Sequence, residues 1–343
     1  MLNHRHSRRY LLQAASAAAL PLLDSCRRAA QATRRREIKV AFVPRITVAG
    51  LYLAEEQGFF REAGLSVERV MQRRNEYLVP LLTGGTIDVG FVQVNPALLN
   101  AVTAGARIRI VAGRDVASRS CGSVGTLYGN RKFFPKGLDD LRALQGRRVA
   151  VSRTTNLEAF TLDTVLASVG LSTTDVEVIQ MEQAQSVIAL AEGKIDATVC
   201  NFLESRPEGL SPEIVRGPSL ADFFPGMQYN FVAFGPSLLD GDSSAGVAFL
   251  TAFFRGSRVS ASGKYSKSLL ETLNRDLGMD PQLALQGCRS GSVLDGSIDG
   301  PSIQRLVDWS ARKGFCPQRP RLSTITDTRF IEAMKTSIHG GKP

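Results

Sequence analysis

Apolar and polar residues along the first part of the chain follow a pattern that predicts short strands and helices in turn. Runs of β-branched and apolar residues at 37–44, 88–92 and 107–112 predict buried strands, and longer segments such as "TVAGLYLAEEQ" and "LEAFTLDTVLASVG" predict helices. Strands that alternate with helices favour parallel sheets covered on both faces. After residue 235 the pattern becomes mainly helical, in "SSAGVAFLTAFFRGS", "IQRLVDWSARKGF" and "TRFIEAMKTS".

One short pattern occurs twice, 108 residues apart. "PLLTGGTIDVGF" begins at Pro80 and "ALAEGKIDATV" at Ala189, and each contains a helix, a glycine, Ile-Asp and a strand. The spacing is much longer than that of a solenoid repeat, so the pattern predicts two similar α/β lobes. Asp88 and Asp196 occupy equivalent places in the two copies, and we expect them to stabilise the turns there, with no role in chemistry.

The N-terminal region has the features of an export signal. A basic start with Arg8 and Arg9 precedes an apolar run that is too short to span a bilayer. The adjacent arginines resemble the twin-arginine export pattern. Two cleavage sites are open. The lipobox-like "LDSC" would give a lipoprotein with its lipid on Cys26, which we favour, and "AQA" would place cleavage after Ala32.

The positive charge of the chain is concentrated in this N-terminal region. The net charge is +10, but eight arginines and one aspartate lie within residues 1–36, which leaves +3 for residues 37–343. We therefore expect no nucleic-acid partner, because the basic excess lies outside the predicted lobes. Membrane association is expected only through a lipid on Cys26.

Histidine and cysteine are too sparse for the usual metal or nucleophilic sites. The histidines are His4, His6 and His339, in the signal region and the tail, so no His-containing triad or metal site is expected in the lobes. The cysteines beyond the signal are Cys121, Cys200, Cys288 and Cys316. In an exported protein they allow three pairings, which stay open. We expect no metal, no cofactor and no catalytic residue.

Several segments, taken in order, resemble one family of binding proteins. They are "YLAEEQGFFREAGLSVERV", "TGGTIDVGFVQ", "LDDLRALQGRRVAVS", "VLASVGLSTTDVEVIQM", "ALAEGKIDATV" and "LVDWSARKGFCPQ". The ordered set resembles the substrate-binding proteins of nitrate-, sulfonate- and taurine-type ABC importers. That family also includes binders and synthases of the thiamine pyrimidine precursor. The resemblance runs from about Ile38 to Lys335.

The resemblance implies an α/β, type II periplasmic-binding-protein fold with two doubly wound lobes and a ligand cleft between them. Two crossings of the chain would join the lobes, near 114–127 and 227–235. The expected divisions are a signal peptide at 1–25, a linker at 26–36, one lobe from 37–120 and 236–343, and a second lobe from 121–235.

The loops that follow the predicted strands form the candidate ligand site. Ligands of open parallel sheets bind beyond the carboxyl ends of the strands, where loops run into helix N-termini. Here those loops carry guanidinium, hydroxyl and amide groups, which suit an anion such as a sulfonate, phosphate or carboxylate. The candidate ligand-binding residues are Arg45, Thr47, Arg74, Gln93, Asn95, Arg119, Ser152, Arg153, Thr154, Thr155 and Asn201.

Some residues in these loops also have a structural interpretation. Asn95 and Asn156 precede helices and are expected to cap them, and Thr154 and Thr155 are equally suited to capping or to ligand contact. The only tryptophan, Trp309, lies in an amphipathic C-terminal segment and is expected in the core.

The function that the resemblance implies is capture of a small, anionic organic or inorganic ligand outside the cytoplasm. The cleft would close on the ligand by hinge motion and deliver it to an ABC transporter permease. No Walker A pattern occurs, so the ATPase would be a separate chain. The alternative is an enzyme on the same fold, in pyrimidine-precursor or menaquinone-type biosynthesis. Pyrimidine synthases would show a cysteine-rich run and active-site histidines, so we expect a non-enzymatic, periplasmic or membrane-tethered protein.

Overall fold

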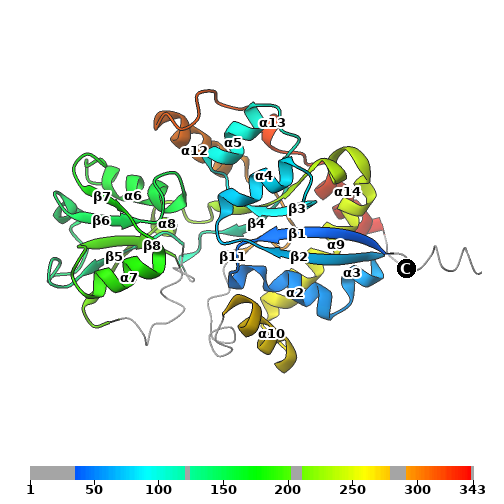
Figure 1. Cartoon of the computed structure of the whole chain (residues 1–343), viewed down its shortest axis with the longest axis horizontal. Helices are drawn as coiled ribbons and strands as arrows, with labels where there is room; N and C mark the ends of the chain where they lie inside the picture. Colours follow the sequence, from blue (N-terminus) through cyan, green and yellow to red (C-terminus); the bar gives the residue numbers. More distant parts are fainter. Residues whose placement is uncertain (1–34, 120–123, 202–210, 279–290, 341–343) are drawn as a thin grey trace, which may run out of the picture.

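Two lobes of similar construction lie side by side in the protein (Figure 1). The computed structural model describes residues 35–119, 124–201, 211–278 and 291–340. Each lobe contains one β-sheet with helices packed against it, which confirms the predicted α/β class with two lobes.

The first lobe is built on a six-stranded sheet. Its strands, in spatial order, are β11 (Gly291–Ser292), β4 (Arg109–Val116), β10 (Gln228–Phe234), β3 (Val89–Val92), β1 (Arg36–Phe42) and β2 (Leu65–Met71). β1 pairs in parallel with β2 and β3, whereas β10 runs antiparallel to both β3 and β4. The strands predicted at 37–44, 88–92 and 107–112 are present as β1, β3 and β4, with ends shifted by a few residues.

Helices cover both faces of this sheet because successive strand residues point to opposite sides. In β10, Val232 and Phe234 face one core, and Phe231 and Ala233 face the other. The helices on the first face are α2 (Ala49–Glu56), α3 (Phe59–Glu62), α9 (Ser243–Ser262), α10 (Lys267–Leu277) and α14 (Arg329–Gly340). Those on the second are α4 (Leu78–Thr83), α5 (Pro96–Thr103), α12 (Gly300–Arg312) and α13 (Leu322–Ile325). A short π-helical turn, η7 (Ser237–Gly241), leads into α9.

The second lobe is built on a five-stranded sheet. Its strands, in spatial order, are β7 (Glu177–Gln180), β6 (Arg148–Val151), β8 (Ala197–Cys200), β5 (Thr126–Asn130) and β9 (Ile214–Ser219). α6 (Leu157–Ala167) covers one face and α7 (Gln183–Ala191) the other, while the short helices η4 (Leu141–Leu144) and α8 (Leu220–Phe223) lie in the connections.

The chain crosses between the lobes twice, and the two crossings lie side by side. The first connects β4 to β5, and the second connects α8 to β10. The backbone N–H of Ala117 donates to the carbonyl of Met227 at 2.8 Å, and the N–H of Gly226 donates to the carbonyl of Ala117 at 2.8 Å. This paired connection is a natural hinge for movement of one lobe against the other.

Two expectations from the sequence are wrong at β5 and β10, the strands that follow the crossings. β5 and β10 run antiparallel to both of their neighbours, so the sheets are mixed instead of parallel throughout. β10 belongs to the six-stranded sheet of the first lobe, although residues 121–235 are expected from the sequence in the second lobe. All seven residues of β10 are buried, and such a pattern does not show which of two sheets receives the strand.

Asp88 and Asp196 explain the repeated pattern. The Asp88 carboxylate accepts from the backbone N–H of Lys39 at 2.8 Å, and the Asp88 N–H donates to the Lys39 carbonyl at 3.0 Å. Asp196 binds Arg148 in the same way, at 3.0 Å in both directions, and also pairs with the Arg148 guanidinium at 2.7 Å. Each aspartate therefore fastens its strand to the neighbouring one. The role is structural, as expected, although the partner is the adjacent strand.

A cluster of aromatic and charged side chains joins the lobes outside the hinge. Trp309 of α12 is 4% exposed, which confirms its predicted place in the core. Its ring contacts Phe160 of α6 edge-on at 5.7 Å between centroids, and its indole N–H donates to Asp163 at 2.6 Å. Lys313 also donates to Asp163, at 2.7 Å. Helices of different lobes are thus held together here.

Several predictions fall on residues outside the described ranges. These are the signal peptide at 1–25, the twin-arginine pair, Cys26, Cys121 and Cys288. Cys200 and Cys316 lie within the described part and are both buried. No helix among the described residues is long and apolar enough to cross a membrane.

Candidate binding cleft between the lobes

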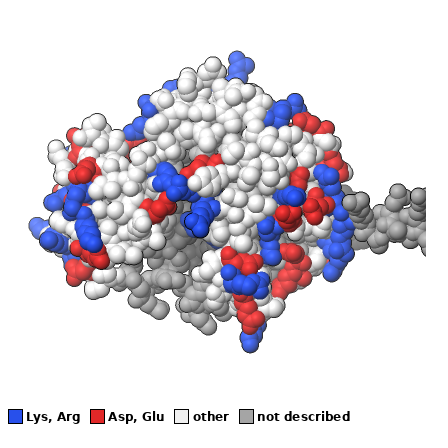
Figure 2. Space-filling model, viewed as in Figure 1, with Lys and Arg blue, Asp and Glu red and all other residues white. Residues whose placement is uncertain are grey.

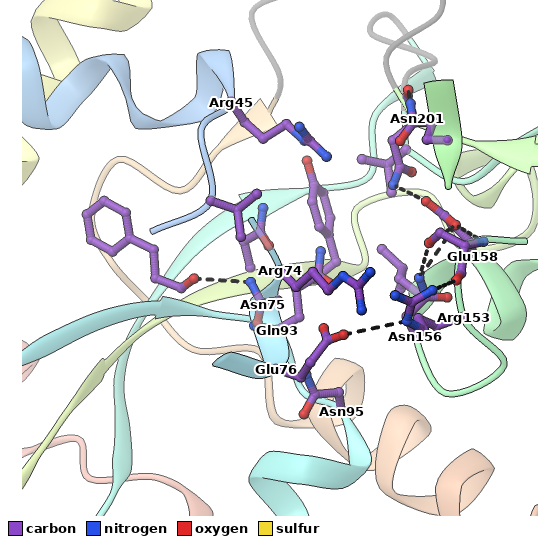
Figure 3. Close-up of a pocket in the computed structure, with 18 of the residues that line it drawn as sticks. Arg45, Arg74, Asn75, Glu76, Gln93, Asn95, Arg153, Asn156, Glu158 and Asn201 are labelled. Carbon is purple, nitrogen blue, oxygen red and sulfur yellow. Dashed lines mark hydrogen bonds and ion pairs between the residues drawn. The ribbon is translucent and has the colours of Figure 1, made fainter. Parts of the chain in front are cut away.

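A cavity of about 150 Å³ lies between the two lobes. Loops at the carboxyl ends of β1, β2 and β3 contribute one wall, and loops after β6, β7 and β8 contribute the other. Figure 3 shows side chains from both walls pointing toward one another across this space. The cavity therefore lies where the rule for open α/β sheets places a ligand.

Buried polar groups at the floor of the cleft, and directly behind it, have unused hydrogen-bonding capacity. Arg114 donates to the Thr47 carbonyl at 2.9 Å, pairs with Asp115 at 3.0 Å and lies over the Phe91 ring at 4.6 Å. The Nε of Arg114, one oxygen of Asp115 and the hydroxyl of Tyr229 have no hydrogen-bond partner among the described residues. An unsatisfied buried polar group costs about 1–3 kcal/mol, so a polar ligand that pairs with one of them gains affinity.

The Tyr229 hydroxyl is suited to donate to such a ligand. The side chain is 2% exposed, and burial raises the pKa of Tyr229 well above its usual range. The hydroxyl therefore keeps its proton at any physiological pH. Buried tyrosine hydroxyls normally find a partner, which makes this one a candidate ligand contact.

The loops of the first lobe are fixed by their own hydrogen bonds. Asn75, in the short turn η2 (Asn75–Tyr77), donates to the Phe91 carbonyl at 3.3 Å and accepts from the Gln93 N–H at 2.7 Å. Asn95 accepts from the Leu98 N–H at 3.0 Å, which confirms that it caps α5. With the backbone held in this way, the Gln93 side chain faces the cavity.

Glu158 accepts several hydrogen bonds in the wall formed by the second lobe. It lies in the first turn of α6 and is 4% exposed. One oxygen accepts from the backbone N–H of Ser152 at 2.8 Å and from the Ser152 hydroxyl, and the other accepts from the Asn201 amide at 3.1 Å. Burial raises the pKa of the Glu158 carboxyl above its usual range, although the hydrogen bonds from Ser152 oppose the shift. The result is a rigid acceptor facing the cleft.

Asn156 completes this wall. Its side-chain oxygen accepts from the Ala159 N–H at 3.1 Å, which confirms the predicted cap of α6. Its amide donates to the Ser152 hydroxyl at 2.8 Å. The cap residue and the buried carboxylate are therefore parts of one network.

Ion pairs connect the two walls. Arg74 of the first lobe pairs with Glu182 of the second at 2.6 Å, and Arg153 of the second lobe pairs with Glu182 at 2.9 Å and with Glu76 of the first at 3.8 Å. Figure 2 shows side chains of both charges next to each other where the lobes meet, and Figure 3 shows Arg74, Arg153 and Glu76 in the cavity.

The structure brings most of the predicted ligand-binding residues to this cavity. Those that line it are Arg45, Thr47, Arg74, Gln93, Asn95, Ser152, Arg153 and Asn201. Arg45 extends into the space between the lobes from the end of β1 (Figure 3). Their contact with a ligand stays a prediction.

Three predicted residues lie elsewhere. Arg119 pairs with Asp222 at 3.3 Å, outside the cavity lining. Thr154 and Thr155 do not line the cavity either, and Asn156 takes the cap position of α6 in their place. The loop turns so that Ser152 and Arg153 face the cleft.

Sequence reasoning missed the residues that lie deepest. Glu158 follows the cap by two residues, a position that the sequence suggests only for favourable interaction with the helix N-terminus. Arg114 and Tyr229 lie at strand ends beside the crossings, and their place depends on where the chain changes lobes. Within the described ranges, no group of three or more His, Cys, Asp or Glu side chains is placed to hold a metal.

Two α/β lobes joined by adjacent crossings around a polar cleft define the periplasmic-binding-protein class of folds. The chain belongs to the NMT1/THI5-like family, whose model matches residues 45–216. This assignment confirms the resemblance found in the sequence.

Individual proteins resemble the chain in sequence or in structure. The chain is 30% identical over 210 residues to a putative thiamine biosynthesis protein of Haemophilus influenzae, and the match covers 60% of this chain and 62% of that protein. Similar solved structures include the periplasmic aliphatic sulphonate binding protein SsuA from Escherichia coli, with a TM-score of 0.69, 14% identity and coverage of 85% of this chain and 92% of that one. The periplasmic nitrate-binding protein NrtA from Synechocystis PCC 6803 has a TM-score of 0.69, 14% identity and coverage of 89% of each chain. At this identity the structural likeness shows the fold alone.

Proposed function

We propose that the protein is an extracytoplasmic solute-binding protein, which captures a small solute between its lobes by hinge closure. The observation that carries the proposal is the cleft itself. Polar side chains from both lobes line it, and the buried Tyr229 hydroxyl on its floor lacks a partner among the described residues. The paired crossings at Ala117 and Met227 suit the opening and closing that capture requires.

The charges of the cleft support a solute with a single negative charge. The lining arginines are Arg45, Arg73, Arg74, Arg114 and Arg153. Three lining carboxylates, together with Asp115 behind Arg114, leave one positive charge in excess. The aliphatic sulphonates and the nitrate bound by the two structural neighbours are also monovalent anions.

The same class of protein supports delivery of the solute to an ABC transporter permease as part of this proposal. The twin-arginine pattern at Arg8 and Arg9 supports export, and a lipid on Cys26 would tether the lobes to the membrane. The permease and the ATPase are then separate chains.

A binding role is favoured over an enzymatic one by the chemistry of the cleft. Among the described residues that line it there is no cysteine or histidine to act as a nucleophile or a base near neutral pH. The carboxylate of Glu158 is bound by Ser152 and Asn201 and so is engaged as an acceptor.

A solute screen tests the proposal. The protein without residues 1–34, which keeps the whole of β1, would be screened by thermal shift against sulfonates, nitrate, bicarbonate, aromatic carboxylates and pyrimidines, and a hit measured by calorimetry. A solute that binds only the folded state raises the melting temperature. Arg45→Ala should weaken the hit about tenfold or more, because a charge-assisted hydrogen bond is lost. Arg119→Ala, the matched change outside the cleft, should leave affinity unchanged. Equal effects of the two changes would contradict the proposed site.

A further inference from the structure

A single carboxylate oxygen binds one arginine from each lobe. Oε1 of Glu182 accepts from Nη2 of Arg74 at 2.6 Å and from Nη2 of Arg153 at 2.9 Å. Arg74 follows β2 in the first lobe, whereas Arg153 follows β6 and Glu182 precedes α7 in the second. All three line the cleft, so this contact lies at the site proposed for the solute.

The arrangement is that of an anion held between two guanidinium groups. Two arginines that converge on one oxygen from opposite sides of a cleft are the usual recognition elements for an oxyanion. Here the oxygen belongs to the protein. The Glu182 side chain is 50% exposed, while those of Arg74 and Arg153 are 37% and 27% exposed. The carboxylate is therefore within reach of solvent and of any ion that enters the cleft.

We propose that Glu182 is a specificity-determining residue that acts as a built-in counter-ion for Arg74 and Arg153. It occupies the position that an anionic group would take between them, and its charge repels further negative charge. The cleft then disfavours divalent oxyanions and admits monovalent or neutral solutes. This inference rests on the proposed function of the cleft, and it names the charge class that the cleft selects.

The expected selectivity follows from Coulomb's law. In a water-like medium, a divalent anion about 6 Å from the Glu182 carboxylate is disfavoured by about tenfold, and a monovalent anion by about threefold. A water-like dielectric is appropriate because Glu182 is half exposed. Removal of the Glu182 charge should therefore favour a divalent anion more than a monovalent one.

Sulfate and methanesulfonate are suitable probes, because they share tetrahedral sulfur–oxygen geometry and differ in charge. Calorimetry at low ionic strength would compare the wild-type protein with Glu182→Gln. The matched control is Glu192→Gln, which removes the same charge at the other end of α7, where Glu192 pairs with Lys194 at 2.6 Å. Glu182→Asp keeps the charge on a shorter side chain.

We expect Glu182→Gln to bind sulfate about tenfold more tightly than the wild type and methanesulfonate about threefold more tightly. Glu192→Gln and Glu182→Asp should change either affinity by less than about twofold. Sulfate affinity in Glu182→Gln that is no higher than in Glu192→Gln would overturn the inference. So would an equal gain for the two probes, because the effect would then not depend on charge.

The outcome is separable from that of the proposed function. If the solute screen yields a cleft ligand and Glu182→Gln fails to gain sulfate, the solute-binding role stands and the role of Glu182 does not. If the screen yields no ligand and Glu182→Gln gains sulfate, the counter-ion role stands and the proposed function is contradicted.

Discussion

Loss of the Asp163 carboxylate should weaken the contact that joins the lobes outside the hinge. Asp163 on α6 accepts from the Trp309 indole at 2.6 Å and from Lys313 at 2.7 Å, both contributed by α12 and its C-terminal end. Only 15% of the Asp163 side chain is exposed, and Trp309 is 4% exposed. The change Asp163→Ala therefore leaves a buried indole N–H with its acceptor removed.

The size of the effect can be worked out from these contacts. A hydrogen bond to a charged group contributes about 1.5–3 kcal/mol, and a partly exposed ion pair contributes at most about 1 kcal/mol. We expect Asp163→Ala to lower the free energy of unfolding by about 2–3 kcal/mol. Lys313→Met should cost less than about 1 kcal/mol, since the Lys313 side chain is 31% exposed. Asp163→Asn, which keeps the shape and a carbonyl oxygen, should fall between the two.

Urea unfolding of the variants, monitored by circular dichroism, provides the measurement. A double-mutant cycle with Trp309→Phe isolates the hydrogen bond, because phenylalanine keeps a ring against Phe160 and removes the indole N–H. We expect a coupling energy of about 1 kcal/mol or more between positions 163 and 309. A coupling below about 0.3 kcal/mol would show that the two side chains act independently and would refute the reasoning.

Three further predictions concern the cleft wall and export. Asn156→Ala should cost about 1 kcal/mol of stability because the cap on the Ala159 N–H is lost, whereas Thr155→Ala should change the urea midpoint little. Because burial raises the folded-state pKa of Glu158, its carboxylate opposes folding at high pH. The wild type should therefore gain stability relative to Glu158→Gln as pH falls through the raised folded-state pKa. A pH-independent difference between the two proteins would contradict this. Cys26→Ala should release the protein from the membrane fraction into the soluble periplasm, and persistent membrane association would exclude the lipid.

Much of the fold could be predicted because its signals are local. The period of apolar residues gave the strands β1, β3 and β4, and the repeated glycine and Ile-Asp pattern indicated two lobes. The place of β10 could not be predicted in the same way. Its residues are buried whichever sheet it joins, and its place is set by pairing with β3 and β4, which are more than 100 residues away in the sequence.

The residues of the candidate site could also be predicted only in part. Residues in loops at the carboxyl ends of strands, such as Arg45 and Gln93, were predicted because strand direction alone brings those loops together. Glu158 and Tyr229 were not, since their position depends on helix rotation and on the path of the crossings. The pairing of the cleft arginines with Glu182 could not be predicted from the sequence either. A sequence displays their positive charge, whereas their pairing with a carboxylate across the cleft appears only in three dimensions.

The most direct test of the solute-binding account is the affinity and stability of Tyr229→Phe. The change removes only the buried hydroxyl, which has no hydrogen-bond partner among the described residues. Calorimetry with the solute from the screen should show affinity reduced about fivefold or more, from loss of a hydrogen bond worth about 1 kcal/mol. The melting temperature of the protein without solute should stay the same or rise, because an unsatisfied polar group is removed. Unchanged solute affinity together with a lowered melting temperature would contradict the account, because the hydroxyl would then serve the fold and not the solute.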